Sequence, residues 1–336
     1  MAQLLGLSLL SLFITAILII PFIDFLYKVK LRRKLQKTVD PFNKPTPFFD
    51  KTNSWKVGTP FGGGILIIFV VIALYLWTFA FLNFETSFWL VFVLLFSFVG
   101  FGILGLYDDI KKLGLGVKNP FFGLRLRHKF AIQWALALVI ASILFYKLNY
   151  SFIFITGFGL VDLGLLYIIL ASFAIVSFAN AFNIADGLDG LASGLLLICL
   201  GAFLAISVAQ LDPGLGTFIA ILMGSVAAFL YFNIFKARIW LGDVGSMSLG
   251  AVLAVIGLLT GKIIALVVIG GVFIIEVGSS LIQLLSKKFL GKKVFPVAPF
   301  HLLLLHRGWE EPKVVMRVWL FGFFFAILGL FIALIQ

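Results

Sequence analysis

The stretch NAFNIADGLDGLASG, from Asn180 to Gly194, places four strongly polar side chains between two apolar runs. They are Asn180, Asn183, Asp186 and Asp189, each three residues after the last. Residues 164–179 and 195–209 carry no charged side chain, and each run belongs to a segment of about twenty residues that can cross a bilayer as a helix. The pattern predicts two membrane helices joined by a polar turn. It raises the question of why two amides and two carboxylates lie there.

The whole chain has the composition of a membrane protein. Of its 336 residues, 62% are hydrophobic and 12% are charged, and the mean hydropathy is +1.18, values outside the range of ordinary soluble domains. The start of the fifth apolar segment is the least defined, because residues 150–162 are also apolar. We predict an all-α polytopic membrane protein, a single domain over residues 1–336, with spans at 3–23, 62–82, 88–106, 130–147, 163–180, 190–209, 215–235, 246–261, 263–285 and 317–335.

The basic residues predict an orientation. All but two of the 26 lysines and arginines lie in four stretches, 28–56, 111–129, 236–238 and 287–317. Because positively charged loops stay on the cytoplasmic side, these stretches predict that side, and ten spans then place both termini outside. Orientation, together with attraction for anionic substrates and lipid head groups, explains the net charge of +12 without a nucleic acid.

Five aspartates fall at the predicted cytoplasmic ends of spans. They are Asp108 and Asp109 in GLYDDIKKLG, Asp186 and Asp189 in the opening stretch, and Asp243 in WLGDVGSMSLG. Any one of them alone could be a solvated surface acid, but five carboxylates on one face repel one another unless cations neutralise them. Mg²⁺ is the cation expected, because it takes oxygen ligands and links one or two carboxylates to substrate phosphates. The sequence has no cysteine–histidine cluster, so zinc is not expected.

The spacing of the opening stretch fits a site for such a cation. Side chains three residues apart lie on neighbouring parts of one helix face, so Asn183 and Asp186 form a candidate pair of oxygen ligands, with Asn180 one turn earlier. Gly187 and Gly190 allow the chain to leave the helix and approach a ligand closely. Helix capping would account for one of the four polar residues, but not for all of them.

Three motifs, in this order and on one predicted face, resemble those of the polyprenyl-phosphate N-acetylhexosamine-1-phosphate transferases. They are GLYDDIKKL, NAFNIADGLDGLASG and WLGDVGSMSLG. Four further stretches are similar to the branch that transfers phospho-N-acetylmuramoyl-pentapeptide: KVGTPFGGGI (56–65), GLRLRHKFAIQ (123–133), GKKVFPVAP (291–299) and GWEEPKVVMRVW (308–319). The resemblance extends over nearly the whole chain.

The resemblance implies a ten-span enzyme of the bacterial cytoplasmic membrane. Such an enzyme transfers phospho-MurNAc-pentapeptide from UDP-MurNAc-pentapeptide to undecaprenyl phosphate, giving lipid I and UMP in peptidoglycan synthesis. The resemblance also implies Mg²⁺ as cofactor and leaves room for a homodimer. By matching position it places Asp243 and Asn183 at the metal and makes Asp108 and Asp109 the essential acidic pair. The other implied substrate positions are Lys129, Gly187, Leu188, Asp189 and Asn233, with Trp240 as an aromatic that stacks on uracil.

The last basic loop departs from the family pattern. The family usually has three consecutive histidines there, whereas PFHLLLLHRGW keeps His301 and continues with Leu302 and Leu303. We expect His301 and Arg307 to hold the sugar pyrophosphate, because an arginine can bind two phosphate oxygens at once, and His306 to matter less. In the opposing interpretation the four leucines anchor the loop in lipid. The departure also leaves open a related N-acetylglucosamine-phosphate transferase.

Two further alternatives stay open at this level. The acceptor phosphate could attack directly, with Asp108 assisting, or the reaction could pass through a covalent aspartyl phosphate. A transporter would have polar residues near the middle of its spans, where this chain has Glu276 as its one acid well inside a span. We therefore expect an enzyme whose catalytic candidates are Asp108, Asp109, Asp186, Asp243 and His301, with Asn180 and Asn183 completing the substrate-binding set.

Overall fold

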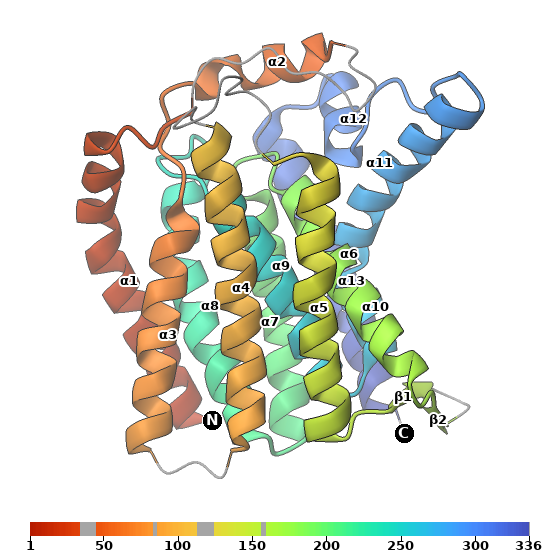
Figure 1. Ribbon diagram of the computed structural model, residues 1–336. Helices are drawn as coiled ribbons and strands as arrows, with labels where there is room; N and C mark the ends of the chain where they lie inside the picture. The colour runs from red at the N-terminus through yellow and green to blue at the C-terminus, as the bar shows by residue number, and fades with distance from the viewer. Residues whose placement is uncertain (34–44, 83–85, 113–123, 156–158, 336) are drawn as a thin grey trace.

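The computed structural model describes residues 1–33, 45–82, 86–112, 124–155 and 159–335. Within these ranges, nine helices are long and apolar enough to cross a membrane (Figure 1). They are α1 (Ala2–Lys28), α3 (Gly63–Phe81), α4 (Phe88–Lys112), α5 (Leu126–Leu148), α6 (Leu166–Ala185), α7 (Leu191–Ala209), α8 (Pro213–Asn233), α9 (Gly242–Leu259) and α13 (Glu311–Leu334). The predicted class, a helical polytopic membrane protein, is confirmed. Segments 34–44 and 113–123 of two predicted basic loops lie outside the described residues.

The predicted span at 263–285 is wrong as a single helix. The chain there forms α10 (Ile263–Ile269) and α11 (Gly271–Phe289), which are bent by 74° relative to each other. At the bend the neighbouring helices come close, since a Cβ on Gly270 would lie 2.4 Å from the ring of Phe178. Two successive glycines provide the backbone freedom that such a bend needs.

A β-hairpin occupies part of the apolar stretch before α6. Its strands β1 (Phe152–Ile155) and β2 (Gly159–Asp162) pair antiparallel, with Phe152 opposite Asp162. The aromatic and β-branched residues of β1 favour an extended strand. As a result, α6 begins at Leu166 rather than at the predicted residue 163.

The two ends of the bundle differ in what they carry. The two termini and the hairpin lie at one end, whereas α2 (Pro47–Asn53) and α12 (Phe300–His306) lie at the other (Figure 1). The short 3-10 helix η1 (Ser54–Lys56) follows α2 directly. The end of α4 and the starts of α5 and α9 also lie at the α2 end. The polar motifs of distant parts of the sequence therefore meet there.

The central helix is α9, and glycines let its neighbours approach it closely. A Cβ on Gly105 of α4 would lie 2.2 Å from the backbone oxygen of Asp243, and one on Gly64 of α3 would lie 2.2 Å from the Cα of Gly245. Small residues at helix contacts are what close packing inside a membrane requires. This packing sets the last turn of α4 beside the first turn of α9, where the acidic motifs lie.

The opening motif forms the turn between α6 and α7. The first of these helices ends at Ala185, and Gly190, with φ +77°, directly precedes the second at Leu191. Glycine adopts this left-handed conformation without the strain that a side chain would add. The predicted polar turn between two membrane helices is confirmed.

Candidate active site

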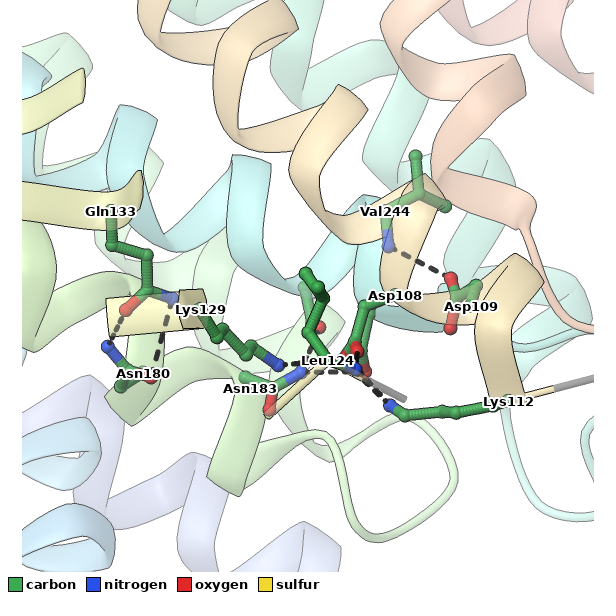
Figure 2. Close-up of polar contacts among 11 residues, drawn as sticks. Asp108, Asp109, Lys112, Leu124, Lys129, Gln133, Asn180, Asn183 and Val244 are labelled. Carbon is green, nitrogen blue, oxygen red and sulfur yellow. Dashed lines mark hydrogen bonds and ion pairs between the residues drawn. The ribbon is translucent and has the colours of Figure 1, made fainter. Parts of the chain in front are cut away.

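Two aspartates and two lysines form the centre of the polar end, here called the central cluster. Asp108 and Lys112 come from the last turns of α4, Lys129 from the first turn of α5 and Asp243 from the first turn of α9. Lys112 Nζ lies 3.2 Å from Asp108 Oδ2 and 2.7 Å from Asp243 Oδ2. Lys129 Nζ lies 3.0 Å and 3.1 Å from the same two oxygens. Figure 2 shows the two lysines reaching Asp108 from opposite sides, so the predicted repulsion between carboxylates is offset by two ammonium groups.

An amide from α6 binds the other oxygen of Asp243. Asn183 Nδ2 donates to Asp243 Oδ1 at 3.1 Å and to the Ser246 hydroxyl oxygen at 2.6 Å. Asn180, one turn earlier, instead donates from Nδ2 to Gln133 Oε1 at 2.8 Å (Figure 2). Asn183 therefore contacts the central cluster, whereas Asn180 links α6 to α5.

Asp109 supports the start of α9. Its Oδ2 accepts the backbone N–H of Val244 at 3.1 Å, and Figure 2 shows its side chain pointing toward that residue. The first N–H groups of a helix have no partner within the helix, and an acidic side chain both satisfies one and interacts favourably with the helix dipole. Asp109 thus helps to hold Asp243, the residue before Val244, in place beside α4.

Asp108, Asp243 and Asn183 provide oxygen ligands of the kind that Mg²⁺ takes. Among the described residues, no group of three or more histidine, cysteine or acidic side chains could hold a metal ion. Mg²⁺ does not need one, because it usually takes one or two carboxylates and completes its coordination with waters and substrate phosphates. The two ammonium groups between Asp108 and Asp243 show that positive charge is accommodated between these carboxylates, so the residues present fit the ion.

A second buried cluster lies where η1 meets the turn between α6 and α7. Lys56 is only 1% exposed, and its Nζ lies 2.7 Å from Glu311 Oε1 and 3.1 Å from Asp189 Oδ1. Asp189 Oδ2 accepts the backbone N–H of Ala237 at 2.9 Å. We call Lys56, Asp189 and Glu311 the Lys56 cluster. The sequence predicts Asp189 as a site residue but neither of its partners.

Trp240 lies beside the Lys56 cluster. Lys56 Nζ is 4.8 Å from the centroid of the indole ring and Arg33 Cζ is 4.9 Å from it, within the range of cation–π contacts. The backbone oxygen of Trp240 accepts the N–H groups of Gly62 and Gly63 at 3.1 Å and 2.9 Å. These contacts hold the half-buried indole against the polar end and argue against a lipid-facing position for it.

Asn233 ties the turn after α6 to the loop before α9. Its Oδ1 accepts the N–H of Gly190 at 3.2 Å and the hydroxyl of Ser193 at 2.8 Å. Its Nδ2 donates to the backbone oxygen of Ile239 at 2.9 Å. This predicted site residue therefore sets the geometry of the turn that carries Gly187 and Leu188.

Charged groups of both clusters shift the pKa of Asp186. Burial, and then the carboxylates of Asp243 and Asp189, raise the pKa of Asp186 well above its ordinary value, while Lys56 opposes the shift. Asp186 directly follows α6, whose last turn contacts Asp243 through Asn183, so it lies close to the predicted acidic set. The described contacts of Asn183 are to Asp243 and Ser246 of α9, and the pairing of Asn183 with Asp186 as oxygen ligands of one cation stays a prediction.

A carboxylate holds the ring of His301, which is buried at the start of α12. His301 Nδ1 lies 2.9 Å from Glu276 Oε2, and the backbone N–H of His301 donates to the same oxygen at 3.3 Å. Leu302 and Leu303 are also buried within the protein, so the interpretation of this loop as a lipid anchor is wrong. Arg307 follows α12 at an exposed position.

Lys112 is the member of the central cluster that the sequence analysis missed. A signal was present in the motif GLYDDIKKLG, where Lys112 follows Asp108 by four residues. That spacing places two side chains on one helix face. The spacing around Glu276, Lys56 and Glu311 does not point to their partners, because those partners lie on other helices or loops.

The family model of glycosyl transferase family 4 matches residues 89–261, just over half of the chain, and the chain belongs to this family. The matched range runs from α4 to the end of α9 and contains the central cluster. Within that class, the chain is similar along most of its length to several phospho-N-acetylmuramoyl-pentapeptide-transferases. The one from Geobacillus thermodenitrificans (strain NG80-2) is 36% identical over 332 residues, which cover 96% of this chain and 95% of the relative.

Two other relatives of the same name give similar values. The transferase of Geobacillus sp. (strain WCH70) is 37% identical over 328 residues, covering 96% of this chain and 95% of its own. That of Rickettsia akari (strain Hartford) is 36% identical over 323 residues, covering 90% and 86%. The two Geobacillus matches, which cover 96% of this chain, also take in α2, α12 and the start of α13, which lie outside the family-model match.

Proposed function

We propose that the protein transfers phospho-N-acetylmuramoyl-pentapeptide from UDP-N-acetylmuramoyl-pentapeptide to undecaprenyl phosphate, forming lipid I and releasing UMP. The shared name of the similar transferases supports this assignment. The observation that carries it is the central cluster, in which Lys112 and Lys129 lie between Asp108 and Asp243. Two phosphate-bearing substrates repel each other, so positive charge held at one point lowers the barrier to their reaction.

In this proposal the lysines bind phosphate oxygens and the acceptor attacks directly. The acceptor is a phosphate monoester with a second pKa of about 6, so it is mostly a dianion at neutral pH and has little need of a general base. An acceptor oxygen forms the new bond to the β-phosphorus while the bond from that phosphorus to UMP breaks. Asp108 already pairs with both ammonium groups, which favours a role in positioning them over formation of an aspartyl phosphate.

The same residues would hold the cofactor. Asp243, with Asp108 and Asn183 beside it, would bind Mg²⁺, which when bound neutralises phosphate charge and polarises phosphoryl oxygens. Lys112 and Lys129 bind oxygens of the transferred phosphate beside these carboxylates. Asp109 holds the start of α9 next to the end of α4.

The nucleotide belongs at the Lys56 cluster. Trp240 offers an aromatic face at its edge, and stacking of a base on such a face stabilises binding by about 1–3 kcal/mol. Gly187 and Leu188 lie in the same turn as Asp189, so the uridine and the sugar pyrophosphate would extend from Trp240 along this turn toward the central cluster. His301 and Arg307, on and after α12, are the proposed contacts of the pyrophosphate.

We place the polar end of the bundle in the cytoplasm of a bacterial cell, with the protein in its cytoplasmic membrane as a single domain. The described parts of the basic stretches 28–56, 111–129, 236–238 and 287–317 join helix ends at this polar end, and positively charged loops favour the cytoplasmic side. Both termini, which lie at the opposite end (Figure 1), are then outside.

One experiment tests the reaction and the donor together. Purified protein in nanodiscs, with undecaprenyl phosphate and Mg²⁺, is given either UDP-MurNAc-pentapeptide or UDP-N-acetylglucosamine, and UMP and the lipid product are measured. We expect UMP and lipid I with the first donor only. Release of UMP with the second donor alone would identify a related N-acetylhexosamine transferase. No UMP from either donor, from protein that shows a cooperative melting transition, would refute the proposal.

A further inference from the structure

We propose that Glu311 is a positioning residue for the nucleotide sugar, which it helps to bind by holding Lys56 and the backbone of Asp189. This inference rests on the proposed function, because it takes the Lys56 cluster as the nucleotide site. Glu311 is the first residue of α13 and belongs to the motif GWEEPKVVMRVW, which has no role in the proposed reaction.

A single carboxylate oxygen makes both contacts. Glu311 Oε1 accepts a hydrogen bond from Lys56 Nζ at 2.7 Å and another from the backbone N–H of Asp189 at 2.8 Å. The side chain is only 7% exposed. Hydrogen bonds to an ionised acceptor are stronger than neutral ones, and low surrounding polarity strengthens them further. Loss of this charge would therefore loosen η1 at Lys56 and the turn at Asp189 together.

The two partners of Glu311 connect to the proposed nucleotide site by separate routes. Lys56 places its ammonium 4.8 Å from the centroid of the Trp240 ring. Asp189 is followed by Gly190, whose N–H is held by Asn233. Glu311 thus sets both the cation next to the aromatic face and the backbone of the turn that would line the nucleotide. It acts through these residues, so it is not a catalytic residue.

The position of the Lys56 ammonium depends on the charge of Glu311. The buried ammonium of Lys56 lies between two carboxylates, at 2.7 Å from Glu311 and 3.1 Å from Asp189. Without the Glu311 charge, attraction would draw the ammonium toward Asp189 alone. The contact with Trp240 and the hold on the Asp189 backbone would then change at the same time.

A purely structural role is the alternative, in which Glu311 only fastens α13 to the rest of the bundle. That role predicts a lower melting temperature and a loss of active protein, with unchanged Michaelis constants for the molecules that remain folded. A positioning role predicts a change confined to the nucleotide sugar. The two roles are therefore separated by substrate-specific kinetics on folded protein.

The matched pair of variants is Glu311→Gln and Glu310→Gln. The two positions are adjacent and the chemical change is identical, but Glu310 is exposed. We expect Glu311→Gln to raise KM for the UDP-sugar on the order of tenfold, as loss of a buried charged hydrogen bond does, and to leave kcat within about twofold. KM for undecaprenyl phosphate should not change. UDP binding, measured by calorimetry without turnover, should weaken by a similar factor, and Glu310→Gln should match wild type in every measurement.

A double-mutant cycle tests whether Glu311 acts through Lys56. In a Lys56→Met background, Glu311→Gln should weaken UDP binding by much less than it does alone, because the shared partner is already gone. The inference would be overturned if Lys56→Met and Glu311→Gln weakened UDP binding by factors that multiply independently in the double variant. It would also be overturned if the Glu311→Gln and Glu310→Gln proteins bound UDP equally well. If Glu311→Gln does not fold, Glu311→Asp keeps the charge at a shorter reach and should raise the same KM. Failure of wild type to release UMP would instead count against the proposed function.

Discussion

His301 Nε2 packs directly against Gly187, because a Cβ added to that glycine would lie 2.6 Å from this nitrogen. His301 belongs to α12 and Gly187 to the turn between α6 and α7, so the last polar loop reaches the opening motif through this contact. Glu276 holds the other ring nitrogen. A carboxylate at Nδ1 fixes the orientation of an imidazole and the role of its second nitrogen. One oriented histidine therefore reaches the proposed pyrophosphate region, although leucines follow it.

We expect His301→Ala to lower kcat/KM at least tenfold, about 1.4 kcal/mol of transition-state stabilisation. Glu276→Gln should lower it by a smaller factor, because the ring stays in place but loses its charged partner. His306→Ala is the control, since His306 is exposed and packs edge-on against Phe48 at 5.1 Å. Steady-state kinetics of the three variants in one nanodisc preparation check this. A silent His301→Ala would remove His301 from the site.

Lys112 and Lys111 provide a matched test of the central cluster. Lys112→Gln removes an ammonium bound to both Asp108 and Asp243, so we expect kcat to fall on the order of a hundredfold. Lys111→Gln removes an ammonium that lies 4.7 Å from the ring centroid of Tyr107, and it should change kcat little. UMP release at saturating substrates measures both. Similar losses in the two variants would mean that overall charge, rather than the cluster, drives the effect.

The carboxylate of Asp243 should be required together with Mg²⁺. We expect EDTA to abolish UMP release by wild type and added Mg²⁺ to restore it, because hard oxygen ligands and phosphates favour this ion. Asp243→Asn should stay inactive at every Mg²⁺ concentration while it keeps a cooperative melting transition in detergent. Full activity of Asp243→Asn at high Mg²⁺ would contradict its placement at the metal.

Gly105 should be intolerant of a single methyl group. Gly105→Ala would place a Cβ 2.2 Å from the backbone oxygen of Asp243, and overpacking of this kind costs about 1–3 kcal/mol. We expect a lower melting temperature and weaker UMP release, because α4 and α9 must move apart. Gly201→Ala in α7 is the control, since a Cβ there meets nothing within 4 Å and alanine is the better helix former. Equal melting curves for the two variants would show that the α4–α9 contact can relax.

The spans could be predicted from sequence because the bilayer itself imposes the rule. A helix must satisfy its own backbone and needs about twenty apolar residues to cross, and α7 and α9 begin within a few residues of the expected places. The bend at Gly270 could not be predicted in this way. Two short helices at 74° have the same average hydropathy as one straight helix, and the cause of the bend is packing against other parts of the chain.

Members of the candidate site could be predicted where they lie in short polar motifs. Asp108, Asn183 and Asp243 each stand in a short polar motif at the end of a span, and the structure brings them together. Lys56 and Glu311 also lie in recognisable motifs, but they are 255 positions apart and nothing in either motif names the other as partner. Buried ion pairs of this kind follow from tertiary packing, so they become visible only once the fold is known.

The burial of α9 bears on how the protein responds to bilayers of different thickness. Inside the bundle, α9 is 89% buried along its apolar window, whereas α1, α5 and α13 are each 28% buried. Helices adapt to hydrophobic mismatch by tilting and by deforming the lipid around them, and those responses act where a helix touches lipid. We therefore expect the outer helices to absorb a change in acyl-chain length. Asp243, at the start of the shielded helix, should keep its depth while the boundary of the molecule adjusts.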